Sequence, residues 1–233
     1  MFISILPHGR MLLIALAVIL TASTAAVCAD SLFQGDEAAP ADAVVLFDGK
    51  DLSKFVSCDS GGPATWKVVD GYCTPKGADI CSKQHFKDCQ LHAEFWVPYM
   101  PNKTGQGRGN SGVFFMGFVY EIQILDSYGL VPKNNDCGSI YSQTPPKINA
   151  CRPPETWQSY DIIFKAPRFD SAGKKIANAR VTVLQNGVLV QDNVAITSPT
   201  PNHSDPEPKE AGPIRLQNHG DAVRFRNVWV RPL

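Results

Sequence analysis

Short apolar runs that alternate with polar residues, separated by glycine, proline and asparagine, extend from Val44 to the end of the 233-residue chain. Alternation with a period of two is typical of a β-strand with one buried face. Asp70-Gly71 and Asn186-Gly187 each lie between two such runs, and these dipeptides are the strongest short-range signal of a β-hairpin. From Val44 onward, no stretch carries the sustained apolar stripe of an amphipathic helix. The sequence therefore predicts an all-β protein.

About twelve strands are predicted from these runs and the breakers between them. They are Val44–Phe47, Trp66–Val69, Gly71–Thr74, Gln90–Val97, Gly112–Met116, Tyr120–Leu125, Ser139–Tyr141, Ser159–Lys165, Ala179–Gln185, Val188–Val194, Ile214–Gln217 and Val223–Arg231. This number of strands favours a two-sheet antiparallel sandwich of the jelly-roll type. Pro-rich stretches at 143–154 and 199–213 are predicted to be long loops, and neither a repeat nor a linker divides the chain. A single domain is therefore expected over residues 44–233.

The first 29 residues have the arrangement of a secretory signal peptide. His8 and Arg10 precede the apolar run Met11–Leu20, and small residues follow up to Ala29. These are the basic, hydrophobic and cleavage-site regions of such a peptide. Because a membrane-spanning helix needs about 20 apolar residues, the run is too short to predict a membrane span. We therefore expect residues 1–29 to be cleaved and the protein to be exported, to the periplasm or outside the cell.

Cys28 leaves lipid attachment open as an alternative to cleavage after Ala29. Val27, directly before it, is bulkier than a lipid-attachment site normally accepts. Residues 30–43 lack apolar periodicity and are predicted to be a flexible lead-in.

The cysteine content agrees with export. Seven cysteines become six once Cys28 is removed, and an even number in an exported chain suggests up to three disulfides among 15 pairings. The six are Cys58, Cys73, Cys81, Cys89, Cys137 and Cys151. Cys137 and Cys151 flank one loop-like segment, and we predict that they form a disulfide. No two cysteines have the C-x-x-C spacing of a structural zinc site.

The charge balance gives no electrostatic reason to expect nucleic acid or an anionic membrane as a partner. Lysine and arginine number 22 together, as do aspartate and glutamate. A neutral polar ligand fits this balance better. No D-x-D-x-D-G loop supports a calcium site, so neither a metal nor a cofactor is predicted, and a structural calcium stays open.

The segment "FVYEIQILDSYG", residues 118–129, combines an apolar face with a polar one. Because side chains alternate along a strand, Tyr120 and Ile122 are predicted to face the core. Glu121 and Gln123 then lie on the opposite face.

A second segment, "GPIRLQNHG" at residues 212–220, has the same character. Alternation places Arg215, Gln217 and His219 on its polar face. If the two segments are neighbours in one sheet, a carboxylate, an arginine, two amides and an imidazole converge on one patch. Ordinary solvated strand faces are the alternative interpretation.

Six motifs occur in order along the chain: "GRGNSGVFF", "YEIQILDSYG", "GSIYSQTPP", "WQSYDIIFKAPRFD", "NGVLVQDN" and "GPIRLQNHGDAVRFRNVWVRPL". Together they resemble the 3-keto-disaccharide hydrolase family, long catalogued as a domain of unknown function. The resemblance runs from about Val44 to Leu233. It implies a concanavalin A-like jelly roll of the lectin and glucanase type. It also implies an exported enzyme whose partner is a carbohydrate, an oxidised glycoside or disaccharide.

The resemblance further implies cleavage of glycosides whose sugar carries a ketone at C3. The ketone acidifies the C2 hydrogen, so that a base can remove it and form an enolate. The enolate expels the C1 substituent by elimination, and addition of water completes a net hydrolysis. Phe118 and Val119 precede the Tyr-Glu pair here, where the family often has a basic residue, so the choice of substrate is left open.

This chemistry needs a general base and groups that stabilise the enolate. Glu121 is the predicted base, because a carboxylate beside Ile122 and Phe118 is expected to have a raised pKa. His219 is predicted to be a second acid or base, and Arg215 to stabilise enolate charge. A structural carboxylate, a loop histidine and a surface ion pair are the respective alternatives.

The predicted substrate-binding residues offer amide, hydroxyl, carboxylate or aromatic groups. They are Gln123, Gln217, Asn110, Ser111, Asp126, Tyr141 and Trp157. Amides and hydroxyls suit sugar hydroxyl groups, and the CH face of a sugar stacks on an aromatic ring. Tyr128 and Phe118 are further candidates for an aromatic rim. Asn110 and Ser111 lie between glycines and also fit a tight turn with no role in binding.

Two other functions remain open at this stage. A non-catalytic carbohydrate-binding module on the same sandwich would also present amides and aromatic residues. The spacing from Glu121 through Gln123 to Asp126 resembles the E-x-D-x-x-E of jelly-roll retaining glucanases, which need carboxyl groups about 5–5.5 Å apart. Residues five apart on a regular strand point to opposite faces, which disfavours the glucanase.

Overall fold

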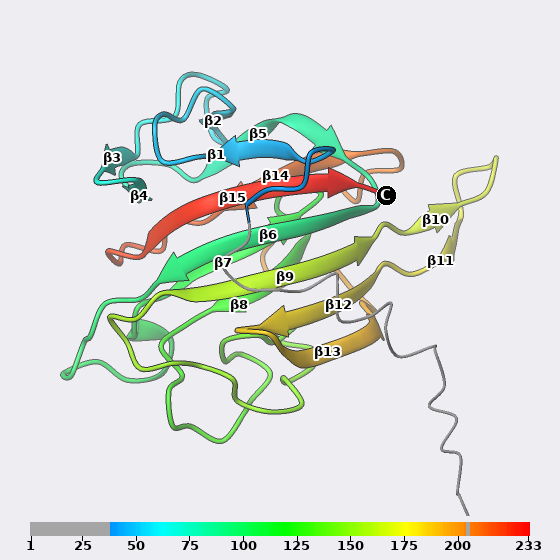
Figure 1. Cartoon of the computed structure of the whole chain (residues 1–233). Helices are drawn as coiled ribbons and strands as arrows, with labels where there is room; N and C mark the ends of the chain where they lie inside the picture. Colours follow the sequence, from blue (N-terminus) through cyan, green and yellow to red (C-terminus); the bar gives the residue numbers. More distant parts are fainter. Residues whose placement is uncertain (1–37, 204–205) are drawn as a thin grey trace, which may run out of the picture. The chain divides into compact units, whose positions relative to one another are not determined.

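The computed structural model describes residues 38–203 and 206–233 (Figure 1). The predicted signal peptide, and the lead-in up to residue 37, lie outside these residues. The described part of the lead-in forms a turn, with Asp42 paired to Arg231 at 2.8 Å. Among the described residues, no helix is long and apolar enough to cross a membrane.

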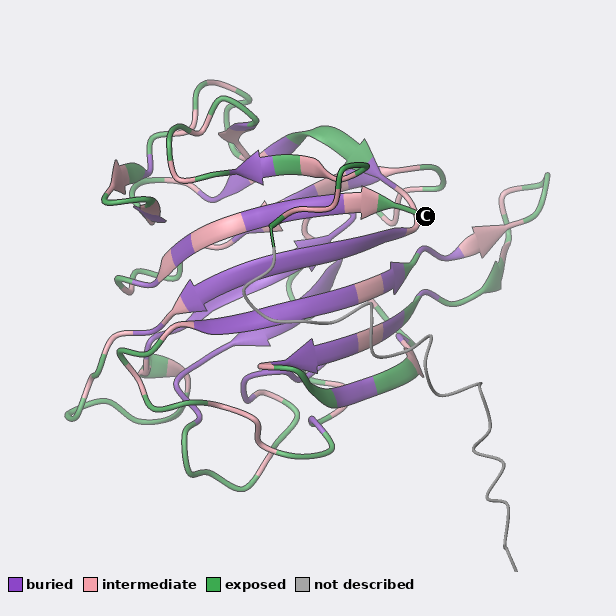
Figure 2. Ribbon diagram, in the orientation of Figure 1, coloured by how far each residue is buried: buried purple, intermediate pink, exposed green. Residues whose placement is uncertain are grey.

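An eight-stranded antiparallel sheet forms one layer. Its strands run in the order β13 (Val188–Ala195), β12 (Arg180–Gln185), β9 (Gln158–Lys165), β6 (Cys89–Trp96), β15 (Arg224–Pro232), β4 (Tyr72–Thr74) and β3 (Lys67–Val69), with β1 (Val44–Phe47) also on β15. The central strands β6 and β9 are buried along almost their whole length, as Figure 2 shows.

A five-stranded antiparallel sheet forms the second layer. Its order is β2 (Phe55–Ser57), β5 (Ile80–Phe86), β14 (Gly212–Leu216), β7 (Ser111–Phe115) and β8 (Tyr120–Ile124). Figure 1 shows β7, β8 and β14 behind the central strands of the larger sheet. A short ribbon of β10 (Arg168–Phe169) and β11 (Lys175–Ala177) and a 3-10 turn, η1 (Gly105–Gly107), complete the described elements. The predicted antiparallel sandwich is confirmed.

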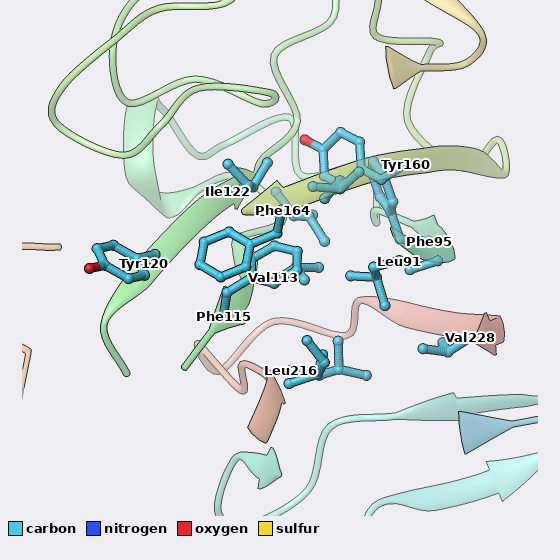
Figure 3. Close-up of a cluster of buried hydrophobic side chains, with 14 of the residues drawn as sticks. Leu91, Phe95, Val113, Phe115, Tyr120, Ile122, Tyr160, Phe164, Leu216 and Val228 are labelled. Carbon is cyan, nitrogen blue, oxygen red and sulfur yellow. The ribbon is translucent and has the colours of Figure 1, made fainter. Parts of the chain in front are cut away.

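The core lies between the two sheets (Figure 3). The Phe115 ring on β7 stacks on the Phe164 ring on β9, with centroids 4.5 Å apart. Tyr120 on β8 also packs against Phe164, at 5.7 Å. Val113, Ile122 and the other inward residues of the smaller sheet fill the space beside them. Removal of this apolar surface from water holds the layers together.

The predicted strands agree with the observed ones to within two residues at each end, with one exception. Both predicted hairpins are confirmed, and Asn186 and Gly187 have the positive φ angles, 53° and 78°, that a two-residue hairpin turn requires. The strand predicted at Ser139–Tyr141 is wrong, because only an isolated bridge joins Ile140 to β8. Strands β2, β5, β10 and β11 were not predicted.

The cysteines differ from the prediction. Cys58 and Cys81 form a disulfide, whereas Cys137 and Cys151 are free thiols. The predicted disulfide between Cys137 and Cys151 is therefore wrong for this structure. The sulfur of Cys137 lies instead 3.1 Å from the hydroxyl of Tyr160, and the Gln185 amide donates to both thiols.

Candidate active site

The two polar segments lie in one sheet, but they are not neighbours. Strand β7 separates β14 from β8, and Phe114 on β7 pairs with Arg215 on one side and with Glu121 on the other. Directly paired residues of an antiparallel sheet share a face. Arg215, Phe114 and Glu121 therefore form one row across the outer face of the five-stranded sheet, away from the core.

A small pocket of about 150 Å³ opens on this face beside Glu121. Its lining consists of Gln106, Asn110, Phe118, Glu121, Gln123, Tyr141, Pro201, Asn202, Gln217 and His219. The structure thus brings together the predicted base, the predicted histidine, three predicted amides and two predicted aromatic residues. Gln106, Pro201 and Asn202 were not predicted, because they lie in the short 3-10 turn η1 or in a loop, where no periodic pattern marks them.

Gly112 lies on β7, the strand between β14 and β8, and leaves room for the pocket because it has no side chain. It pairs with Gln123 on β8, and its carbonyl accepts a hydrogen bond from the Gln217 N–H at 3.1 Å. A Cβ atom at this position would lie 3.0 Å from Oε1 of Glu121 and 2.9 Å from the Phe114 ring. The missing side chain leaves the space into which the Glu121 carboxylate projects.

Glu121 is a nearly buried carboxylate, 7% exposed. Oε2 accepts a hydrogen bond from the Thr200 hydroxyl at 2.8 Å, and the Thr200 N–H donates to the Val119 carbonyl at 2.7 Å. When the Gln123 amide is oriented to suit its neighbours, its nitrogen donates to Oε1 of Glu121 at 3.0 Å. Burial raises the pKa of Glu121 to about 7, although the Thr200 hydrogen bond and the charge of Arg215 act to lower it. This carboxyl group can therefore both accept and release a proton near neutral pH.

The loop that follows η1 positions Asn110, and the segment after β14 positions Gln217. Asn110 donates to the Gln106 carbonyl at 2.8 Å through its side chain and to Asp221 Oδ2 at 2.8 Å through its backbone. Oε1 of Gln217 is buried and finds no hydrogen-bond partner in the part of the chain that the structure describes. A buried acceptor without a partner is costly, so a ligand hydroxyl that donates to it would be bound favourably.

Arg215 borders the pocket without lining it. Its Nε donates to Asp79 Oδ2 at 2.7 Å, and its guanidinium lies over the Phe118 ring, 4.3 Å from the centroid. Asp79 also accepts a hydrogen bond at 2.8 Å from the backbone of Asn218, which precedes His219. This unpredicted carboxylate therefore fixes both the arginine and the loop that brings the exposed His219 to the pocket.

The other predicted substrate contacts lie elsewhere. Ser111 is fully buried and donates to the Gln217 carbonyl at 2.8 Å, which ties β7 to β14. Asp126 is paired with Arg108 at 2.7 Å and does not line the pocket. Trp157 lies at the end of the larger sheet, under the guanidinium of Arg226. None of the three is placed to contact a ligand beside Glu121.

The loop at residues 138–141 runs along the free edge of β8. The Tyr141 N–H donates to the Glu121 carbonyl at 3.2 Å, which keeps the tyrosine beside the pocket. The predicted rim residue Tyr128 is half exposed and does not line it. Within residues 38–203 and 206–233, no three His, Cys, Asp or Glu side chains are grouped to hold a metal ion.

Comparison with known proteins identifies the family of this chain. Residues 42–231 match the 3-keto-alpha-glucoside-1,2-lyase-like domain. A crystal structure of a proposed glycosyl hydrolase from Parabacteroides distasonis ATCC 8503 is 46% identical, with a TM-score of 0.76 over 84% of this chain and 85% of that one. A second such structure from the same organism, 20% identical with a TM-score of 0.63 over 82% and 94%, shares the fold. No curated protein matches the chain significantly.

The sandwich and its relatives define a glycosyl hydrolase-like β protein. Within that class, the chain belongs to the 3-keto-alpha-glucoside-1,2-lyase-like domain family, which confirms the family predicted from the sequence motifs.

Proposed function

We propose that this protein is an enzyme that cleaves glycosides oxidised to a ketone at C3, with Glu121 as the base that removes the C2 proton. The observation that carries the proposal is a nearly buried carboxylate in the lining of a small polar pocket, and this burial raises the pKa of Glu121 to about 7. A general base works best when its pKa lies near the working pH. The family supports a sugar substrate with this oxidation pattern.

The pocket residues Glu121 and His219 carry out the proton transfers of this reaction. Glu121 takes the proton from C2, and the bonding electrons form the enolate of C2, C3 and the ketone oxygen. The enolate electrons return to form a C1–C2 double bond and expel the C1 substituent, which takes a proton from His219. Water then enters the pocket, where the Glu121 carboxyl group exchanges its proton with it. The water oxygen adds to C1 as its proton passes to His219, and Glu121 delivers a solvent-derived proton to C2. The products are the 3-keto sugar and the free aglycone.

The other polar groups in and beside the pocket bind the sugar or stabilise the enolate. Gln123, Asn110 and Gln217 offer hydrogen bonds to sugar hydroxyls, and Oε1 of Gln217, which has no partner among the described residues, is an acceptor for one of them. Arg215 supplies positive charge near the developing enolate, in the way that preorganised charges stabilise transition states. Among the residues that the structure describes, Glu121 is the one carboxylate that lines the pocket, so the geometry does not favour a retaining glucanase.

We also propose that the protein is exported, as the first 29 residues indicate. The Cys58–Cys81 disulfide supports this, because disulfides persist in oxidising compartments.

Substrate oxidation is the direct test of the reaction. We expect the purified protein to release aglycone from 3-keto glycosides and to leave the unoxidised parent glycosides intact, because only the ketone acidifies C2. Release would be followed by chromatography on matched pairs of substrates. Cleavage of the unoxidised glycosides would contradict the proposal. Saturable sugar binding without turnover of either set would instead favour a carbohydrate-binding module.

Gly112 offers a test of the pocket geometry. Gly112→Ala is expected to lower kcat/KM on a 3-keto glycoside by about 10-fold to 100-fold, since the new methyl group displaces the Glu121 carboxylate. Gly107→Ala is the control, because its Cβ would have Lys103 Cδ as nearest neighbour at 3.8 Å. Equal activity of the two variants would show that the space over Gly112 is not needed.

A further inference from the structure

A second, larger cavity of about 550 Å³ lies on the same face of the five-stranded sheet. Val56, the Cys58–Cys81 disulfide, Met116 and Pro213 give it a largely apolar lining, and Arg215 stands at its border. Its volume falls in the range of cavities that enclose drug-sized ligands, whereas the pocket beside Glu121 is below that range. A glycoside seated with its sugar beside Glu121 must therefore place its C1 substituent outside the small pocket.

One row of paired residues connects the two spaces. Val56 on β2 pairs with Cys81 on β5, and Cys81 pairs with Arg215 on β14. Arg215 pairs with Phe114, which pairs with Glu121. Because neighbouring strands lie about 4.8 Å apart, the border of the large cavity is roughly 10 Å from Glu121 along this row. That separation suits the substituent of a sugar bound at Glu121.

Strand β14 connects the spaces in the other direction. Pro213 and Arg215 line the large cavity, whereas Gln217 lines the small pocket. Alternate residues along an extended chain share a face, so these three side chains follow one another on the outer face of the sheet and lead from the large cavity to the small pocket. The Arg215 guanidinium over the Phe118 ring forms the boundary between the spaces.

The chemistry of the lining differs between the spaces. The small pocket offers amides and an imidazole, which suit sugar hydroxyls. The polar side chains of the large cavity are those of Ser57, Asp59, His85 and Arg215, and Arg215 already donates to Asp79. The rest of the lining is mainly apolar, with Val56, Met116, the disulfide and three prolines, so an aromatic ring would gain more from burial against it than the hydroxyl groups of a second sugar ring.

We propose that the large cavity holds an aromatic substituent at C1, so that the substrates are aryl 3-keto glycosides rather than 3-keto disaccharides. This rests on the proposed function, because the sugar must sit beside Glu121. Arg215 borders the space where the leaving oxygen departs, and the phenol produced leaves through the large cavity.

The test compares phenyl, methyl and glucosyl 3-keto glucosides with the full protein. The wild-type kcat/KM is expected to be at least about 10-fold higher for the phenyl substrate than for the methyl one, since phenoxide is the better leaving group and a buried ring is also removed from water. Val56→Asp should lower this ratio by about 10-fold and leave the methyl rate within about twofold, because the difference in leaving ability is the same in both proteins. An unchanged ratio would overturn the aryl specificity. Val45→Asp, on the exposed side of β1 in the other sheet, is the control. Inhibition by added phenol, weakened in Val56→Asp, is a second readout.

The outcomes separate the two proposals. Cleavage of all three substrates with no preference for phenyl, or a preference for the disaccharide, would overturn the aryl specificity and leave the proposed reaction standing. Cleavage of none of them would overturn the reaction and the specificity with it. A methyl rate that survives in Val56→Asp shows that the variant is folded.

Discussion

Glu121→Gln is expected to lower kcat on a 3-keto glycoside by about 10²-fold to 10⁴-fold, the contribution of a positioned general base. Glutamine keeps the size of the side chain and can still accept the Thr200 hydrogen bond. It cannot accept the C2 proton. Glu210→Gln is the matched control, because Glu210 is an exposed partner of Lys87. A loss of less than about tenfold in Glu121→Gln would contradict the assignment of the base.

The pH dependence of activity and of stability gives a second test of the role of Glu121. With a pKa of about 7 in the folded protein, Glu121 is protonated below neutrality, so kcat/KM should rise with pH up to about 7. The folded pKa lies above the ordinary value of 4.5, so ionisation of the buried group weakens folding increasingly from pH 4.5 to 7. Glu121→Gln should therefore be more stable than wild type at pH 8, and the difference should vanish at pH 4. Urea unfolding at both values measures it.

Asp161→Ala is expected to destabilise the protein by about 3–5 kcal/mol, because it leaves a buried charge without its partner. On the outer face of the larger sheet, His92 Nδ1 lies 2.7 Å from Asp161 Oδ1, and the His92 ring stacks on Trp229. Glu94 lies 3.8 Å from the other ring nitrogen. All of these side chains are nearly buried. Chemical denaturation at pH 6.5 measures the loss.

The charge of His92 gives this loss a pH dependence. Burial lowers the pKa of His92, but the hydrogen bonds to Asp161 and Glu94 outweigh it and raise the pKa to about 9. A raised histidine pKa stabilises the folded state fully below 6.5 and loses this effect as the pH rises through 9. The loss in Asp161→Ala should therefore shrink at pH 10. Asp192→Ala, which removes an exposed pair with Lys147, should cost no more than about 1 kcal/mol. Equal losses in the two variants would contradict the buried pair.

Most strands were predictable because one face of each is buried and alternation reveals it. Strand β5 was not, because its middle residues Lys83, Gln84 and His85 are exposed and interrupt the apolar pattern. Val119 breaks the alternation of the "FVYEIQILDSYG" segment because it lies in the turn before β8 and is buried there. Tertiary packing thus overrides the local pattern at both places.

The candidate site was predictable in its polar faces but not in its assembly. Alternation placed Glu121 and Gln217 on polar faces, yet it carries no information on strand order, and β7 lies between them. The contact of Thr200 with Glu121 joins residues 79 positions apart through a loop without periodicity. Asp79 likewise reaches Arg215 from a distant loop. Long-range contacts of this kind leave no signal in a single sequence.

Removal of the C2 hydrogen is the central claim, and the most direct measurement follows a deuterium label at that carbon. A 3-keto glycoside deuterated at C2 would be cleaved in ordinary water, and the label in the 3-keto sugar product would be measured by mass spectrometry against product incubated without enzyme. Loss of the deuterium to water in step with aglycone release is the predicted result. Cleavage that leaves the C2 deuterium in the product would contradict the account, because the Glu121 carboxyl group exchanges with the entering water before it protonates C2.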